Sequence, residues 1–311
     1  FLVNGPRDSL ILKLFADGAQ NSSLQLFANL ITKGEGVILN FDPSNIYLND
    51  QFWMIDKDNE ILIGDRIISK NLKLYNGMSE LLVDLEIGAE EKKTDIFLSN
   101  IFIEDFTQFL ALKDIDLNGI ANGRVSVDLS DDSPGFYGDL MVENIKVNDY
   151  QIGNLNTSAI LDLPNKKVKL NGNLYGEDNE VDINGTYSFA KKITENDFDL
   201  NFDIKNFAIY SIEDFIPLYI DNTDGTVSGS LSLVGPRNKP DLLGFLDIND
   251  VTTTVTFLQT SYNIKNQRVL FDKNGINLGD KLKITDMEGN AAYGEGRVYH
   301  TNLRDFGLDI D

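Results

Sequence analysis

The sequence contains no cysteine and a single histidine, His300, among its 311 residues. The missing cysteines exclude disulfide bonds, cysteine-ligated zinc and cysteine nucleophiles, and any serine-histidine-aspartate triad would have to use His300. Basic residues are also scarce, because 27 lysines and arginines face 49 aspartates and glutamates, which gives a net charge of −22. A chain with this charge repels a phosphate backbone, so we expect no nucleic-acid partner.

The sequence also lacks any run of 18 apolar residues that could span a bilayer, and it begins at Phe1 without a methionine or a basic signal region. Its last residues, from Phe306 onward, still alternate apolar and polar as a strand does. We therefore expect a fragment of a longer protein. The hydrophobic fraction of 42% and the aromatic fraction of 10% are too high for a disordered chain, so the fragment should fold.

Alternation of apolar and polar residues is the main signal along the chain. From Phe198 to Lys205 the apolar side chains fall on one face of a strand, and the acidic and amide side chains fall on the other. Asn-Gly and Asp-Gly pairs between such runs are typical of tight hairpins. The pattern predicts an all-β, antiparallel fold. The residues on the apolar faces are Leu81, Val83, Leu85, Ile87, Val125, Val127, Leu129, Leu140, Val142, Phe198, Leu200, Phe202, Ile204, Leu231, Leu233, Leu246, Ile248, Leu282 and Ile284.

Two short stretches have a helical pattern, residues 103–110 and 212–219, and both contain Ile-Glu-Asp-Phe. Each is followed by the motif G-x-x-x-G and then by P-x-x-x-G. These motifs are Gly119 to Gly123 with Pro134 to Gly138, and Gly225 to Gly229 with Pro240 to Gly244. The motifs keep an offset of 106 (229 − 123), whereas the helical stretches differ by 109 (212 − 103). A fixed period predicts a repeat architecture, with segments 1–102, 103–211 and 212–311, the last one truncated.

The apolar face of each strand has to be covered, and the residues leave two solutions open. Two sheets can close on each other as a sandwich or solenoid, or one curved sheet can form an open trough. An open trough would suit acyl chains, because each buried methylene contributes about 0.8 kcal/mol. Side chains of the two helical stretches would then either plug the trough or merely connect strands. The candidate plug residues are Phe106, Phe109, Phe215 and Leu218.

The ordered combination of a short helix, G-x-x-x-G, a strand, P-x-x-x-G and a further strand occurs twice. This combination resembles the carboxy-terminal region of the TamB proteins, which belong to the AsmA-like group of repeating β-groove proteins. The stretches 266–280 and 284–300 are also similar to that family. The resemblance covers most of the chain and is strongest from about Ile103 onward.

The resemblance implies an elongated, curved antiparallel β-sheet that forms a taco-like open hydrophobic groove, with short helices between repeats. The apolar-face residues given above would line this groove. It also implies a periplasmic lipid conduit in a Gram-negative envelope, which moves phospholipid to the outer membrane. Its partners would be the acyl chains, an Omp85-type outer-membrane barrel such as TamA, and the inner membrane, reached through an anchor missing here. The alternatives are an assembly factor for outer-membrane barrels that transfers no lipid, and a structural β-solenoid or adhesin.

We predict no catalytic residue, no metal and no cofactor. Glu104-Asp105 and Glu213-Asp214 could be the paired carboxylates of a hydrolase, but neighbouring side chains diverge on a helix, and acidic residues in its first turn stabilise the helix dipole. The acidic segments 56–60 and 221–225 contain oxygen ligands that calcium uses. Neither follows the twelve-residue spacing of a calcium loop, so solvated turns are the favoured interpretation.

Overall fold

The computed structural model confirms the all-β, antiparallel class. It describes residues 2–4, 9–17, 23–48, 51–105, 116–129, 135–148, 150–162, 165–211, 220–256, 258–279, 281–301 and 304–310. Nearly all of the regular structure in these residues is β-strand, and η1 (Ile103–Asp105) is a single 3₁₀ turn. The described residues include no helix that is both long and apolar enough to cross a bilayer.

The chain divides into two compact units. Unit 1 comprises residues 1–148 and 158–163, and unit 2 comprises residues 149–157 and 164–311. This division follows packing, whereas the segments 1–102, 103–211 and 212–311 follow the sequence repeat. The repeat boundaries therefore remain a prediction.

The strands of unit 1 are antiparallel to their partners throughout. They are β1 (Leu2–Asn4), β2 (Ser9–Asp17), β3 (Ser23–Lys33), β4 (Gly36–Phe41), β5 (Asn45–Leu48), β6 (Gln51–Ile55), β7 (Glu60–Ile63), β8 (Ile67–Lys70), β9 (Leu72–Asn76), β10 (Ser79–Ile87), β11 (Lys92–Phe102), β12 (Leu117–Asp128) and β13 (Gly135–Val147).

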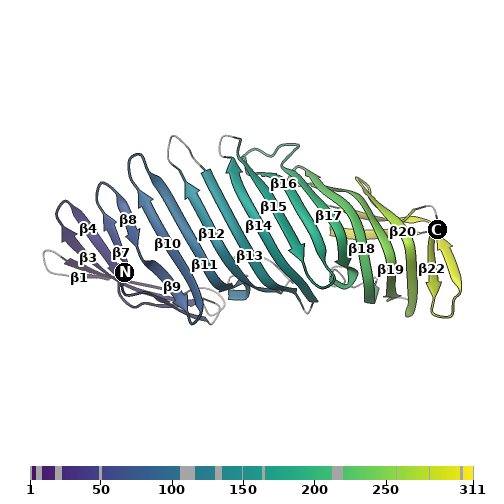
Figure 1. Ribbon diagram of the computed structural model, residues 1–311, viewed down its shortest axis with the longest axis horizontal. Helices are drawn as coiled ribbons and strands as arrows, with labels where there is room; N and C mark the ends of the chain where they lie inside the picture. Colours follow the sequence, from purple (N-terminus) through teal and green to yellow (C-terminus); the bar gives the residue numbers. More distant parts are fainter. Residues whose placement is uncertain are drawn as a thin grey trace. The chain divides into compact units, whose positions relative to one another are not determined.

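In unit 1 a group of short strands, β4 to β9, lies between the longer strands β3 and β10 (Figure 1). The long strands β10 to β13 pair in sequence order as a meander. Between β3 and β10 the strands are short and form two files, β4–β7–β8 and β5–β6–β9. Since β3 pairs with both β4 and β5, and β10 with both β8 and β9, each pair of short strands takes the place of one long, interrupted strand.

Buried polar side chains close the interruptions between the two files. The Asn59 side chain accepts a hydrogen bond from the Phe41 amide at 2.7 Å and donates one to the Phe41 carbonyl at 2.8 Å. The Ser69 hydroxyl accepts from the Leu85 amide at 2.7 Å and donates to the Val83 carbonyl at 2.9 Å. Because an unpaired buried backbone group is costly, these side chains replace the ladder hydrogen bonds that the interrupted strands lack.

Unit 2 contains residues 150–157 of β14, whose other residues belong to unit 1, and all of the later strands. They are β14 (Tyr150–Asp162), β15 (Lys167–Tyr175), β16 (Glu180–Ser188), β17 (Phe198–Ala208), β18 (Ile220–Gly235), β19 (Asp241–Val255), β20 (Thr260–Asp272), β21 (Gly275–Asn277), β22 (Leu282–Asp286), β23 (Ala291–Gly294), β24 (Gly296–Thr301) and β25 (Arg304–Ile310).

The strands β15 to β20 form a second meander in sequence order (Figure 1). At β20 the sheet forks. Residues 270–272 pair with β21, which continues to β24 and β25, and residues 262–264 pair with β22, which continues to β23. Unit 2 therefore ends in two arms that share one long strand.

The sequence repeat is visible in the backbone at Gly123 and Gly229. Their φ angles are 153° and 151°, in a region that other residues rarely adopt. A Cβ at Gly123 would collide with the carbonyl oxygen of Asp139, and one at Gly229 with that of Phe245. Both positions therefore require glycine, because the backbone of the neighbouring strand occupies the space of a side chain.

A second 3₁₀ turn lies at the repeat offset from η1. The 3₁₀ turn Ile103–Asp105 corresponds to a 3₁₀ turn at residues 209–211, with the same offset of 106 (209 − 103) as the glycines. Ser211 therefore takes the place of Asp105, and the second tetrapeptide begins one residue after its turn. The rest of the predicted helices, residues 106–110 and 212–219, lies outside the described residues.

Candidate apolar groove

The predicted lining residues of unit 1 fall into rows that cross the strands. Leu81 on β10 is directly opposite Leu74 on β9 and Leu98 on β11. Leu98 is opposite Gly123 on β12, which is opposite Leu140 on β13. Residues directly opposite each other lie on the same face of a sheet, so these five residues form one continuous row across the strands.

Further rows of unit 1 run parallel to this one on the same face, which we call the apolar face. Val83, Ile96 and Val125 are opposite one another across β10, β11 and β12. The register also places Leu85 opposite Thr94, which is opposite Val127. At one end of these strands Ile87 is opposite Lys92, and Leu129 hydrogen-bonds through its amide to the Lys92 carbonyl. Val142, opposite Ala121, continues the face on β13.

The apolar face of unit 2 contains a longer row. From β16 to β21 and on to β24, each residue in this row is directly opposite the next. The row consists of Ile183, Phe202, Leu231, Gly244, Phe271, Ile276 and Val298. Every member is apolar or glycine, so no polar side chain interrupts it over seven strands.

The other predicted residues of unit 2 flank this row on the same face. Leu200 is opposite Leu233, Ile204 is two residues beyond Phe202, and Phe198 lies 5.1 Å from the Tyr187 ring. The register brings Leu246 opposite Gly229, Ile248 opposite Val227, Leu282 opposite Gly294 and Ile284 opposite Ile264.

None of the 19 predicted lining residues is fully buried. Ile87 and Leu129 are exposed, at 39% and 52%, and the other 17 (19 − 2) are half-buried. Residues beneath a complete second layer would be buried, so these side chains contact their neighbours in the sheet and stay within reach of solvent. The candidate plug residues Phe106, Phe109, Phe215 and Leu218 lie outside the described residues.

A line of buried residues on the same face was missed by the sequence analysis. In unit 1 Ile46, Trp53, Ile55 and Ile101 form a buried cluster, and Trp53 is only 1% exposed. In unit 2 Val181, Val227, Val251 and Val269 are buried, and Val181 is opposite the predicted Ile204. The alternation at Val181 and Ile183 was a sequence signal for this line.

Of the carboxylates that a hydrolase could use, Glu104 and Asp105 lie on the 3₁₀ turn Ile103–Asp105. Asp105 is buried, and this burial, followed by the nearby charge of Glu104, raises the pKa of its carboxyl to about 6. Glu104 accepts a hydrogen bond from the Gly119 amide at 3.3 Å. In the segment 56–60, Asp56 accepts from the Asp58 amide, as in a solvated turn. No cluster of three acidic or histidine side chains suited to a metal is found among the described residues.

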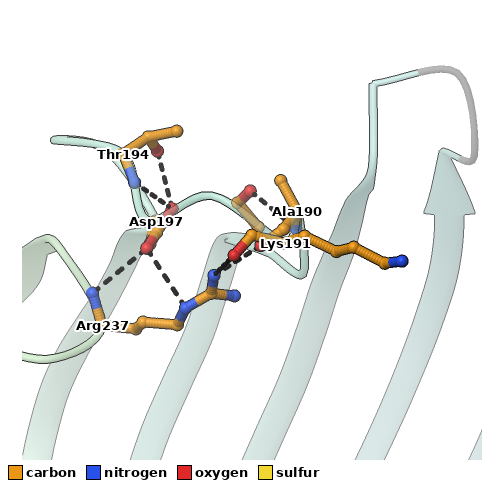
Figure 2. A network of polar contacts seen from close by, with 6 residues as sticks. Ala190, Lys191, Thr194, Asp197 and Arg237 are labelled. Carbon is orange, nitrogen blue, oxygen red and sulfur yellow. Dashed lines mark hydrogen bonds and ion pairs between the residues drawn. The ribbon is translucent and has the colours of Figure 1, made fainter.

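A polar network at one end of the unit 2 strands connects two loops (Figure 2). Asp197, which is 0% exposed, accepts from the Thr194 hydroxyl at 2.6 Å and forms an ion pair with Arg237 at 3.6 Å. The same Arg237 donates to the carbonyls of Ala190 and Lys191. The hydroxyl of Thr194, then the amides and Arg237, hold the pKa of the Asp197 carboxyl below its usual value. The network fastens the loop before β17 to the loop before β19.

Hollows on the described surface lie mostly among polar side chains. One hollow of about 510 Å³ is lined on β20 and β22 by residues such as Asn263, Lys265, Lys283 and Thr285. None of the predicted lining residues contributes to it. The apolar rows therefore lie on an open face and not in this hollow.

Antiparallel strands in sequence order, with recurring glycine positions and apolar rows on one face, define the class of repetitive β-sheet proteins. Residues 169–310 match the family model described as the TamB C-terminal domain. The match falls on β15 to β25 and supports a TamB-family carboxy-terminal region in this part of the chain. No curated protein and no solved structure matches the chain.

The TamB family consists of envelope proteins that span the periplasm. The family is associated with outer-membrane partners and is linked to translocation and assembly or to lipid transport. It is a transport and assembly family and not a known enzyme family.

Proposed function

We propose that this chain carries phospholipid acyl chains along its apolar face, as one part of a bridge across the periplasm toward the outer membrane. The observation that carries the proposal is the unbroken row from Ile183 to Val298. In the complete protein, an Omp85-type barrel related to TamA would meet the bridge at the outer membrane, and an anchor would hold it at the inner membrane.

The length of this row suits a lipid tail. Seven strands give six spacings of about 4.8 Å, a path of about 29 Å. One tail spans about half of the ~30 Å hydrocarbon core of a bilayer, so a tail lying along the row is covered over its whole length. Each methylene that leaves water contributes about 0.8 kcal/mol, and successive positions along the row offer similar contacts. A tail therefore moves along it without a deep minimum, and no residue has to perform chemistry.

The test is the lipid content of protein purified without detergent, measured by mass spectrometry after extraction. Phe202→Glu places a charge in the centre of the row, where an unpaired charge beside acyl chains is costly. Asn201→Glu adds the same charge to the exposed opposite face of β17 and is the matched control. We expect the wild type and Asn201→Glu to carry phospholipid at comparable levels, and Phe202→Glu to lose most of it.

Wild-type protein with only trace phospholipid would contradict the proposal. It would favour the other function linked to the family, assembly of outer-membrane barrels without lipid transfer. Equal lipid in Phe202→Glu and Asn201→Glu, with both variants folded by circular dichroism, would show that the lipid binds elsewhere.

A further inference from the structure

We propose that Trp53 sets the depth of the apolar groove in unit 1, and so determines how much acyl chain that unit holds. This inference rests on the proposed lipid-carrying function and deepens it, because it assigns a capacity-determining residue to one of the two units. We call Ile46, Trp53, Ile55 and Ile101 the groove floor of unit 1.

The pairing register places the floor residues on the face that carries the predicted lining. Trp53 on β6 is opposite Ile46 on β5, which is opposite Leu24 on β3. Two residues farther along β6, on the same face, Ile55 is opposite Leu74, a member of the row through Leu81. The floor therefore lies beside the row of lining residues and not behind the sheet.

The floor is filled by side chains of the same face. Trp53 is 1% exposed and Ile55 is 4% exposed. Leu81 and Leu98, both members of the apolar row, pack against this cluster. A hydrocarbon chain in unit 1 must lie over Leu81 and Leu98, because the space beside them is occupied by the indole ring and its isoleucine neighbours.

The buried residues on the apolar face of unit 2 are smaller. Val181, Val227, Val251 and Val269 are buried there, and Val227 is opposite the predicted lining residue Ile248. An indole ring is far larger than an isopropyl group, so the apolar face is filled more deeply in unit 1 than in unit 2. The difference in depth between the two units follows from the size of the buried side chains, tryptophan in unit 1 and valine in unit 2, and not from the pairing of the strands.

Truncating Trp53 tests the inference, because a dry apolar cavity accepts apolar ligands. Trp53→Ala should raise the phospholipid extracted per protein molecule above the wild-type ratio. Trp53→Phe, a smaller truncation that is easier to fold, should change the ratio in the same direction by less.

The matched control is Ile38→Ala. Ile38 on β4 is 7% exposed, but it neighbours Leu39 in an alternating strand and therefore faces away from the apolar face. Its truncation should destabilise unit 1 without changing the lipid ratio. Ratios that rise equally in Ile38→Ala and Trp53→Ala, or that stay at the wild-type value in both tryptophan variants, would overturn the inference.

A second measurement uses Trp53 as the only tryptophan of the chain. Protein loaded with phospholipid brominated on its acyl chains should show quenched Trp53 emission, while aqueous iodide should leave it unchanged. The reference is Phe202→Trp combined with Trp53→Phe, which reports on unit 2. Quenching in the reference without quenching of Trp53 would overturn the groove floor alone. No quenching in either protein, together with no extracted lipid, would overturn the proposed function and the inference with it.

Discussion

Two asparagines, Asn59 and Asn179, occupy nearly solvent-free positions where a sheet would otherwise lose hydrogen bonds. They are 1% and 3% exposed, and each follows an aspartate and precedes a glutamate. Asn179 accepts from the Ala208 amide at 2.8 Å and donates to the Ile152 carbonyl at 2.7 Å. An amide side chain suits this role, because it presents one acceptor and two donors, as a backbone does. The shared Asp-Asn-Glu triplet was a sequence signal for both positions.

Replacing Asn59 by alanine should lower the free energy of unfolding by about 2 kcal/mol, because the amide and carbonyl of Phe41 would be left buried without partners. Urea unfolding followed by circular dichroism measures the loss. Gln25→Ala on β3 removes an exposed amide of the same unit and should change stability little. Equal losses in both variants would show that Asn59 does not support the interrupted strands.

The buried carboxyl of Asp105 should make stability fall as the pH rises. Its folded-state pKa of about 6 lies above the usual 3.8, so the folded chain holds a proton that the unfolded chain has released between these values. The penalty for the charged form is therefore absent below pH 4 and complete above pH 6. Asp105→Asn should gain stability over the wild type at pH 7, on the order of 1 kcal/mol, and the gain should vanish near pH 4. Urea unfolding of both proteins at the two pH values tests this, and a gain that is independent of pH would contradict it.

At the scale of the strands, glycine determines where neighbouring backbones approach each other. Gly123 and Gly229 stand in the apolar rows, between Leu98 and Leu140 in unit 1 and between Ile204 and Leu246 in unit 2. At each position the adjacent strand comes close enough to exclude a Cβ. The sheet therefore requires glycine at the last position of each G-x-x-x-G motif. Because glycine has no side chain, the apolar row is lower at this position than at its neighbours.

Gly229→Val should destabilise unit 2 by about 2 to 4 kcal/mol, because the added side chain meets the Phe245 carbonyl and φ is unfavourable for valine. Gly307→Ala on β25 is the control, since no atom lies within 4 Å of its added Cβ. Thermal unfolding of both variants gives the comparison. If Gly229→Val were as stable as Gly307→Ala, β18 and β19 could move apart at this position without a loss of free energy of unfolding, which would contradict the prediction.

At the scale of the molecule, the net charge is −22, and on β17 the acidic side chains lie on the face opposite the apolar row. On β17 the outward residues Asp199, Asn201 and Asp203 are exposed, whereas Phe202 between them is half-buried. Phe245 is an aromatic residue on the outward face, and the Arg268 guanidinium lies over its ring, 4.1 Å from the ring centre. The acidic outward surface keeps the protein in water while the apolar face remains open.

This charge should prevent the protein from lying on an anionic bilayer. Vesicles rich in phosphatidylglycerol should not co-sediment with it at low ionic strength, whereas cationic vesicles should, and 0.15 M salt should weaken the latter contact. Salt-sensitive binding to the anionic vesicles would contradict the prediction. If the anionic vesicles do not bind, lipid is collected through contacts with the apolar face and not through attraction of the whole surface to a membrane.

The sequence by itself determined the all-β class, the repeat after Gly123 and the side of the sheet to which residues such as Phe202 and Leu231 belong. These features follow from local physics, because successive side chains of a strand point to opposite faces whatever its partners are. The helical stretches were less predictable, and only Ile103–Asp105 of the first is described, as a 3₁₀ turn. A short run with helical spacing has too few turns to fix its own conformation.

The tertiary structure alone decided where the long strands are interrupted, how Asn59 closes an interruption and that Trp53 fills the groove floor of unit 1. Asn59 finds its partner Phe41 18 residues away, and Asn179 finds Ala208 29 residues away. Periodicity assigns a residue to a face, but the depth of that face depends on which side chains meet across strands. That meeting is set by pairing register between distant segments, which no local pattern encodes.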